Sequence, residues 1–337
     1  MIIRLLLLTI YFFIFSFVNA QSIDTLEKTS IVKAEIKYDT SYIYQFERKF
    51  VIRSIVASKN FNLIIAPKNN IENSESLKVK YKPNVSYYSG LGASYNNLYF
   101  QMLFSIPNSH KHEEEYGTTQ YTDLNLGFHH DKLSEAFFYQ KFKGLYAETN
   151  HLGYEQNIIR EDIELLKTGI RVFYQFNERF SVHSVYKQTQ LQKKSTDAWM
   201  ARIDAYYQRI TADSSILLTP EQNEYYSGIN NLWKVEHYVI NFQFGYAYNF
   251  SFAKHFYISP FIFAGMGPQQ IQYDDLASKI YSINYSANLK LFAGYTRKRI
   301  LIGIIFDTQY HITPTDIARI YTNSPFIQFS AGYRFNL

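Results

Sequence analysis

The sequence contains no cysteine, only two tryptophans and no long run of basic residues among its 337 positions. Without cysteine the chain forms neither disulfides nor thiolate metal sites, and it cannot carry a lipid on a cysteine after its apolar leader. After residue 20 no stretch reaches about 18 consecutive apolar residues, the length that a membrane-spanning helix needs. The mild charge predicts no nucleic-acid partner.

The first twenty residues carry the one long apolar stretch. Arg4 precedes an almost wholly apolar run over 5–18, and Val18-Asn19-Ala20 offers a small residue for cleavage before Gln21. This pattern predicts a secretory signal peptide over 1–20, with an uncleaved anchor helix as the alternative. Without Arg4, 33 basic residues stand against 29 acidic ones, so the net charge of the mature chain is +4.

Tyrosine and phenylalanine are abundant, with 31 and 28 copies. This composition, with no second long apolar run, favours a membrane β-barrel, which has aromatic girdles at both interfaces and a polar lumen. A large secreted β-sandwich is the alternative.

The last eleven residues alternate strictly between apolar positions and polar or small ones. The apolar set is Ile327, Phe329, Ala331, Tyr333, Phe335 and Leu337, and the polar or small set is Gln328, Ser330, Gly332, Arg334 and Asn336. Such alternation predicts a strand with one face toward lipid and one toward a wet lumen. In a soluble protein its apolar face would be an exposed edge that invites aggregation, whereas in a barrel the strand closes against the first one.

The same test along the chain predicts an all-β, transmembrane, antiparallel up-and-down β-barrel over 50–337. The expected strands are 50–67, 77–95, 98–106, 119–128, 135–146, 163–176, 180–192, 197–209, 214–219, 232–250, 256–265, 279–295, 300–312 and 326–337. This makes about 14 strands, with 12 possible because 214–219 is weak. Short turns near residues 96, 129, 177, 213, 251 and 296 then fall on the periplasmic side. Residues 21–49 are expected to form a periplasmic lead-in or a plug.

Projecting the alternation inward predicts a charged lumen. Its candidate residues are Asp123, Lys141, Lys143, Arg171, Asp204, Lys290, Asp307 and Arg334. Charges in such a wall must be paired or hydrated. They form either a salt-bridged network that braces the barrel or a constriction that selects polar or anionic solutes.

No catalytic, metal or cofactor site is assigned. The sequence has no Gly-x-Ser-x-Gly motif; Ser181 and His183 share a face of one expected strand, and His311 is a further inward candidate. The cluster of His110, His112 and residues 113–115 could hold a divalent cation, although a solvated charge run is the simpler interpretation. Gly265-Met-Gly267 is too short for a dinucleotide loop, so we expect no cofactor.

These observations predict a narrow pore or a structural, surface-exposed protein of the bacterial outer membrane. The alternatives are a lipid-active enzyme that uses His183 or His311, and a barrel that binds a partner through the loops 147–162 and 214–231. Membrane lipid and lipopolysaccharide are the expected partners in every case.

Several stretches resemble a family of Gram-negative outer-membrane barrels known only as a domain of unknown function. They are Tyr38-Asp-Thr-Ser-Tyr42, Tyr81-Lys-Pro-Asn84, Gly90-Leu-Gly92, residues 140–146, Lys194-Ser195 and Asp213-Ser214-Ser215. The resemblance implies a barrel and no activity. The C-terminal strand also resembles the signal that such barrels present to their assembly machinery, through Phe329, Tyr333, Phe335 and Leu337, where an aromatic residue is usual at the last position.

Overall fold

The structure is a computed structural model, and its unit Tyr38–Leu337 is described below. The described residues are 38–46, 50–69, 74–84, 87–106, 112–226, 232–273, 279–316 and 318–335. The expected signal peptide, most of the expected lead-in, His110 and Leu337 lie outside these residues.

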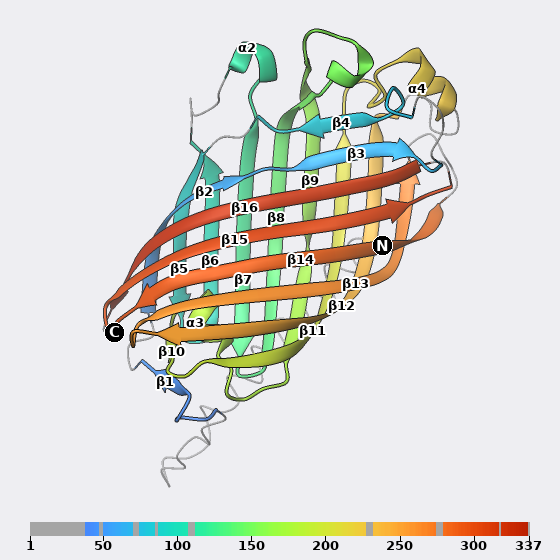
Figure 1. Ribbon diagram of the computed structural model, residues 1–337. Helices are drawn as coiled ribbons and strands as arrows, with labels where there is room; N and C mark the ends of the chain where they lie inside the picture. Colours follow the sequence, from blue (N-terminus) through green and yellow to red (C-terminus); the bar gives the residue numbers. More distant parts are fainter. Residues whose placement is uncertain are drawn as a thin grey trace, which may run out of the picture. The chain divides into compact units, whose positions relative to one another are not determined.

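Twelve antiparallel strands close a ring (Figure 1). They are β2 (Phe50–Lys59), β5 (Tyr87–Tyr95), β6 (Leu98–Ser105), β7 (Gln120–His130), β8 (Leu133–Ala147), β9 (Ile158–Gln175), β11 (Thr196–Thr211), β12 (Lys234–Phe252), β13 (Phe256–Tyr273), β14 (Ile280–Thr296), β15 (Ile300–Pro314) and β16 (Ala318–Phe335). Each pairs with its neighbour in the chain, and β16 pairs with β2 to close the ring. The predicted all-β barrel is therefore confirmed.

Two further strands bring the sheet to fourteen and divide its wall. β3 (Asn62–Pro67) continues from β2 along β16, and β4 (Val79–Lys82) joins β3 to β8. The pairings β16–β3, β3–β4 and β4–β8 therefore connect β16 to β8 directly, without β5, β6 and β7. Replacing β2, β5, β6 and β7 by β3 and β4 leaves a circuit of ten strands at one end of the barrel.

Two of the expected strands were wrong. The segment 180–192 forms the short helix α3 (Val182–Tyr186) and the three-residue strand β10 (Gln190–Gln192), and 214–219 forms no strand. The expected strands 50–67 and 77–95 are each divided in two, which restores the total of fourteen in the sheet. The expected turn near residue 213 lies instead in a long loop between β11 and β12.

Most of the short turns lie at one end of the ring, which also carries the long segment 176–195 between β9 and β11. Two-residue turns join β5 to β6 and β7 to β8, and three-residue turns join β12 to β13 and β14 to β15. Asn96 adopts φ 49°, the positive value expected for its tight turn. We call this the periplasmic end and the opposite one the loop end, following the arrangement of bacterial outer-membrane barrels.

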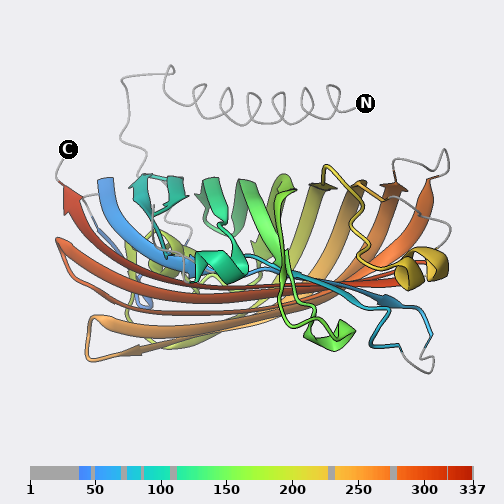
Figure 2. The same cartoon turned by 90° about the horizontal axis from the view of Figure 1, so that it is seen from above.

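The loop end carries α2 (Glu113–Tyr116), the short helix η1 (Asn150–Leu152) and α4 (Pro220–Tyr225), and Figure 2 looks down on it. No helix among the described residues is long and apolar enough to cross a membrane. At the periplasmic end β1 (Ile43–Gln45) pairs with β10 in a separate two-stranded sheet.

Strand β12 has the two faces that its alternation predicts. Ile240, Phe242 and Phe244 are about half exposed on the outer face. Asn241 and Asn249 are fully buried on the inner face. Strand β13 continues to Tyr273, so the loop expected from residue 266 begins later than predicted.

Gly265 and Gly267 lie inside strand β13, where a side chain would collide with strand β12. A Cβ on Gly265 would lie 2.0 Å from the carbonyl oxygen of Phe242, and one on Gly267 would lie 1.9 Å from that of Ile240. The glycines therefore allow close approach of the two strands.

Candidate functional site: the lumen

The middle of the lumen contains three buried carboxylates, each held by a cation. Asp204 accepts hydrogen bonds from Nε of Arg171 and Nε of Arg202, both at 2.9 Å. Because both arginines converge on one carboxylate, Asp204 joins strands β9 and β11 in one ion-paired group. Its side chain is 3% exposed.

The other two carboxylates extend this network around the ring. Nζ of Lys290 lies 3.1 Å from Asp307, which also accepts a hydrogen bond from Asn288 at 2.6 Å. Asp123 lies 3.8 Å from Nζ of Lys59 and accepts a hydrogen bond from Gln140 at 3.0 Å.

Four cations pair with these three carboxylates, Lys167 is a fifth cation in the same layer, and aromatic rings face each of the five. The cations are Lys59, Lys167, Arg171, Arg202 and Lys290. Nζ of Lys167 lies 4.3 Å from the ring centroid of Tyr206, and Arg202 lies 5.3 Å from that of Phe263. A cation over a ring face is stabilised by the ring quadrupole, more so away from water. The abundant aromatic residues thus serve the lumen as well as the lipid interface.

Six of the eight predicted lumen residues face inward in the structure: Asp123, Arg171, Asp204, Lys290, Asp307 and Arg334. Lys141 and Lys143 face outward instead. Lys141 pairs with Glu164 at 2.7 Å on the outer wall, and Lys143 is exposed.

Three central cations were missed by the sequence reasoning: Lys59, Lys167 and Arg202. Two carried a usable signal, because Arg202 lies two positions before Asp204 and Lys167 four positions before Arg171, on the same strand faces.

At the periplasmic end, the segment 177–195 folds into the ring and is held by two arginines of the wall. Arg53 on β2 donates to the carbonyl oxygen of Lys187, and Arg334 on β16 donates to that of Gln188. Arg334 also donates to the carbonyl oxygens of Arg297 at 2.7 Å and Lys298 at 2.9 Å in the turn before β15. One residue thereby joins the closing strand, a turn and the inserted segment.

Apolar packing supports the same segment. Phe180, Val182 and Val185 are buried against Phe261 and Phe292 of the wall. Its far end pairs with β1, and the amide of Lys193 donates to the carbonyl oxygen of Tyr42 at 2.7 Å.

The residues considered for catalysis form no nucleophile–base pair. Oγ of Ser181 donates to Gln190 at 2.5 Å and accepts from the amide of Ser184, which makes it the N-cap of α3. Nδ1 of His311 lies 3.2 Å from the amide oxygen of Asn284. Within the described residues neither His183 nor His311 contacts a serine in the geometry of a triad.

Nor is a metal centre visible in the described part of the chain, where no group of three or more His, Asp or Glu side chains converges. His112 precedes α2, and the acidic residues 113–115 occupy its first turn. His110 lies outside the described residues.

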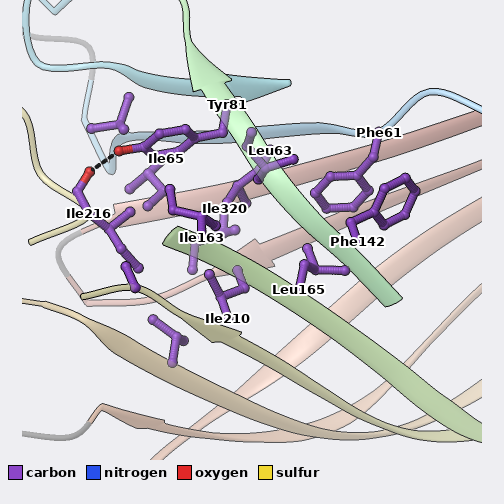
Figure 3. Close-up of a cluster of buried hydrophobic side chains, with 14 of the residues drawn as sticks. Phe61, Leu63, Ile65, Tyr81, Phe142, Ile163, Leu165, Ile210, Ile216 and Ile320 are labelled. Atoms are coloured by element: carbon purple, nitrogen blue, oxygen red, sulfur yellow. Dashed lines mark hydrogen bonds between the residues drawn. The ribbon is translucent and has the colours of Figure 1, made fainter. Parts of the chain in front are cut away.

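The loop end of the lumen is filled by one apolar core (Figure 3). Its members come from strands β2 to β9, β11 to β13 and β16 and from the loop after β11, and they include Leu63, Ile65, Tyr81, Phe142, Ile163, Leu165, Ile210, Ile216, Leu217 and Ile320. The hydroxyl of Tyr81 donates to the carbonyl oxygen of Ile216 at 2.8 Å, which anchors the loop to β4.

Above this core the loops form a hydrogen-bonded cap, which we define as residues 74–82, 148–162 and 212–226. Arg160 donates to the carbonyl oxygens of Ser214 and Ser215 at 3.1 and 2.8 Å. Gln222 donates to those of Ser76 and Lys78 at 3.1 and 3.2 Å. The cap is therefore an ordered layer built on β4.

The outer wall is apolar between two polar rims. Its exposed side chains include Phe100, Phe104, Trp199, Ile203, Ile240, Phe242, Phe244, Ile262, Met266, Ile304, Ile327 and Phe329. Phe329, Tyr333 and Phe335 of the expected assembly signal are on this face of β16.

A closed antiparallel ring with an apolar outer wall, a charged middle of the lumen and mostly short turns at one end defines a β-barrel of the bacterial outer membrane. The chain belongs to the family described as a domain of unknown function, DUF4421, whose model matches residues 37–335. The resemblance to a family of outer-membrane barrels of unknown function, predicted from the sequence, is thus confirmed.

No curated protein matches the sequence. Among solved structures, the outer-membrane protease OmpT from Escherichia coli is similar at 7% identity over 87% of this chain and 99% of its own, with a TM-score of 0.39. The toluene transporter TodX of P. putida is similar at 8% identity over 86% and 91%, with a TM-score of 0.29. A bacterial polysaccharide outer-membrane secretin gives 11% identity over 85% and 98%, with a TM-score of 0.35.

Proposed function

We propose that this protein is a closed, non-conducting outer-membrane barrel that holds a rigid cap at the cell surface. The observation that carries the proposal is the apolar core at the loop end, which occupies the lumen where a pore would need an aqueous path. A constriction that passes polar solutes requires polar groups along its whole length.

The free energy of burying this core opposes spontaneous opening of the lumen. Burying one Leu, Ile or Phe side chain contributes about 1.5–3 kcal/mol, so exposing five of them would cost about 7 to 15 kcal/mol. That range equals the total stability of many proteins. The charged middle layer then serves to brace the wall, because its carboxylates are all paired.

Planar bilayer recordings test the proposal. The wild-type protein is expected to give no stepwise conductance. Deleting 212–226 removes Ile216, Leu217 and Tyr226 from the apolar core and is expected to produce steps. Deleting 177–195 leaves that core in place and is expected to remain silent, which makes it the matched control.

Stepwise conductance of the wild-type protein, with a selectivity that changes in Lys290→Gln or Arg334→Gln, would establish the narrow pore instead. All variants must first show heat-modifiable migration on a gel, because a closed barrel resists detergent until it is boiled.

The ordered cap favours partner binding as the purpose of the closed barrel. Its three segments are tied together by Arg160, Gln222 and Tyr81 rather than left as separate loops, so a binding surface would be preorganised. Removal of 148–157 is expected to spare the barrel and to abolish surface binding of a partner, whereas unchanged cell-surface binding would count against the cap.

The lipid-active alternative receives less support from the geometry. His183 and His311 are buried inside the ring, away from the lipid-facing wall. We therefore expect purified protein to leave phospholipid and lipid A intact; turnover that His183→Ala or His311→Ala abolishes in a folded barrel would contradict this.

A further inference from the structure

Charged side chains gather on one part of the outer wall, over strands β8, β9, β11 and β12. The register places Lys143, Glu164, Thr211 and Lys234 in one row across these strands. Lys141, Leu166, Arg209 and Glu236 form the next row toward the membrane. These side chains point away from the lumen, because their neighbours Phe142, Ile163 and Ile210 are buried inside it.

We call the four cations Lys141, Lys143, Arg209 and Lys234 the basic patch. Glu164 lies 2.7 Å from Nζ of Lys141 and 3.4 Å from the Arg209 guanidinium. Four cations stand against the two carboxylates of these rows, so the rows carry a net charge of +2. Nε of Arg209 is covered and has no hydrogen-bond partner among the described residues.

The next row toward the membrane gives the depth of the patch. It contains Tyr139, Thr168, Tyr207 and Tyr238, and the rings of Tyr207 and Tyr238 lie 5.1 Å apart. Tyrosine belts lie at the headgroup level of a bilayer, with the hydrocarbon beyond them. The basic patch is therefore at the level of lipid phosphates, on the side of the membrane that the long loops face.

Beyond β12 the wall carries less charge at this height among its described residues, with the single exposed cation Lys279 opposite Gln272. The register continues from Glu236 to Gln272 on β13, and from Tyr238 to Gln270 and then to Tyr281 on β14. The excess of cations is thus concentrated over β8, β9, β11 and β12, which indicates local recognition rather than a uniform basic rim.

We propose that the basic patch binds the phosphate groups of a phosphorylated glycolipid in the outer leaflet. Phosphate oxygens accept from both Lys and Arg, and the Arg fork can bind them in a bidentate way. A ligand that carries two phosphates would offset the excess of positive charge. When no ligand is bound, Glu164 holds Lys141 and Arg209 in place through its ion pairs with both.

An apolar groove on the adjoining wall fits the acyl part of such a lipid. It has a volume of 760 Å³ and is lined by outward side chains of β12, β13 and β14, among them Phe242, Met266 and Ile283. The pairing of β12 with β13 is interrupted next to it, at Pro268, which has no N–H to donate. On β12 the groove begins at Phe242, six residues beyond Glu236 of the charged rows.

Lipid titration of the purified full-length barrel, freed of glycolipid and followed by native mass spectrometry, tests the proposal. The probes are bisphosphorylated lipid A, the same lipid after removal of its phosphates, and phosphatidylglycerol. The wild-type barrel is expected to prefer the first. The double variant Lys141→Gln, Arg209→Gln is expected to lose that preference by about tenfold or more, the effect of losing one or two hydrogen bonds to charged groups.

The matched control is Lys279→Gln, Arg319→Gln, which removes two exposed cations near the loop end outside the patch and should bind as the wild type does. Glu164→Gln keeps all four cations and is expected to bind bisphosphorylated lipid A more tightly. Equal losses in both double variants, or equal wild-type binding of all three lipids, would overturn the proposal. Heat-modifiable migration verifies the folding of each variant.

Discussion

The guanidinium of Arg334 lies 3.6 Å from the ring centroid of Phe46, two residues that stand 288 positions apart in the sequence. Arg334 belongs to the closing strand β16, and Phe46 follows β1 at the start of the described chain. The same guanidinium donates to the carbonyl oxygen of Gln188. The segments 38–46 and 177–195 therefore share one anchor on the closing strand.

Replacing this anchor should loosen the inserted segment without opening the barrel. Arg334→Lys keeps the charge but cannot reproduce the planar stack on Phe46 or the several directed hydrogen bonds. We expect a local loss of about 1–3 kcal/mol in the protection of 186–192, measured by hydrogen exchange. Arg299→Lys, at an exposed turn position, is the control, and equal protection in the two variants would show that the anchor is dispensable.

Asp204 is the residue on which the middle layer depends. Asp204→Asn removes the carboxylate between Arg171 and Arg202 and leaves two buried cations without their shared partner. Breaking a buried ion pair from one side typically costs about 3–5 kcal/mol. We expect a lower midpoint of urea unfolding in micelles than for Glu155→Gln in an exposed loop, and equal midpoints would show that the network contributes little.

Tyr81 joins the cap to the apolar core. Tyr81→Phe retains the ring and removes the hydroxyl that donates to Ile216 and accepts from Arg160. We expect a local destabilisation of about 1 kcal/mol, seen as faster hydrogen exchange over 212–226. Tyr154→Phe, whose side chain is exposed, should leave this exchange unchanged; the same acceleration in both variants would contradict the anchor role.

Strand alternation could be read from the sequence because lipid and lumen impose opposite demands on the two faces of a strand. In the expected strand 232–250, alternation predicts an outer Phe242 and an inner Asn241, and the structure has both in these positions. It is missing in 180–192, where the chain lies inside the ring and protein surrounds it on every side. Polar Ser181 and apolar Val182 are both buried there, so the apparent alternation described no strand.

The prediction that Lys141 and Lys143 face the lumen was wrong because of a local irregularity in β8. The pairing of β8 with β9 shifts register between Lys143 and Leu145, and Gly144 between them has φ 84°. One extra residue in a strand exchanges its two faces. Leu145, beyond the shift, is buried inside, so counting every second residue through the bulge assigns the lysines to the wrong side.

The stretches that carry the family resemblance lie where the parts of the barrel are joined. Tyr81 donates to the loop after β11, and Asn84 donates to the carbonyl oxygen of Gly117 at 2.7 Å. Ser214 and Ser215 accept from Arg160. Such contacts depend on the division of the wall by β3 and β4, which no periodicity in the sequence could indicate.

The inserted segment should respond to acid through His183. Burial, with repulsion from Lys187 and His130, holds the pKa of His183 well below its usual range. In the released segment that pKa returns to about 6.5, so below this pH the released form binds more protons than the inserted one. Insertion is therefore fully favoured above about pH 6.5 and weakens as the pH falls.

Hydrogen exchange over 182–192 at pH 5 and pH 7.5, corrected for intrinsic rates, measures this effect. The wild-type segment should be less protected at pH 5, and His183→Gln should reduce the difference, because it removes the proton acceptor. His129 on β7, whose ring centroid lies 6.1 Å from that of His183, keeps part of the response. The control is His112→Gln, which removes an exposed imidazole outside the inserted segment and should keep the wild-type pH response. If His183→Gln also kept the full response, the effect would belong to groups other than His183.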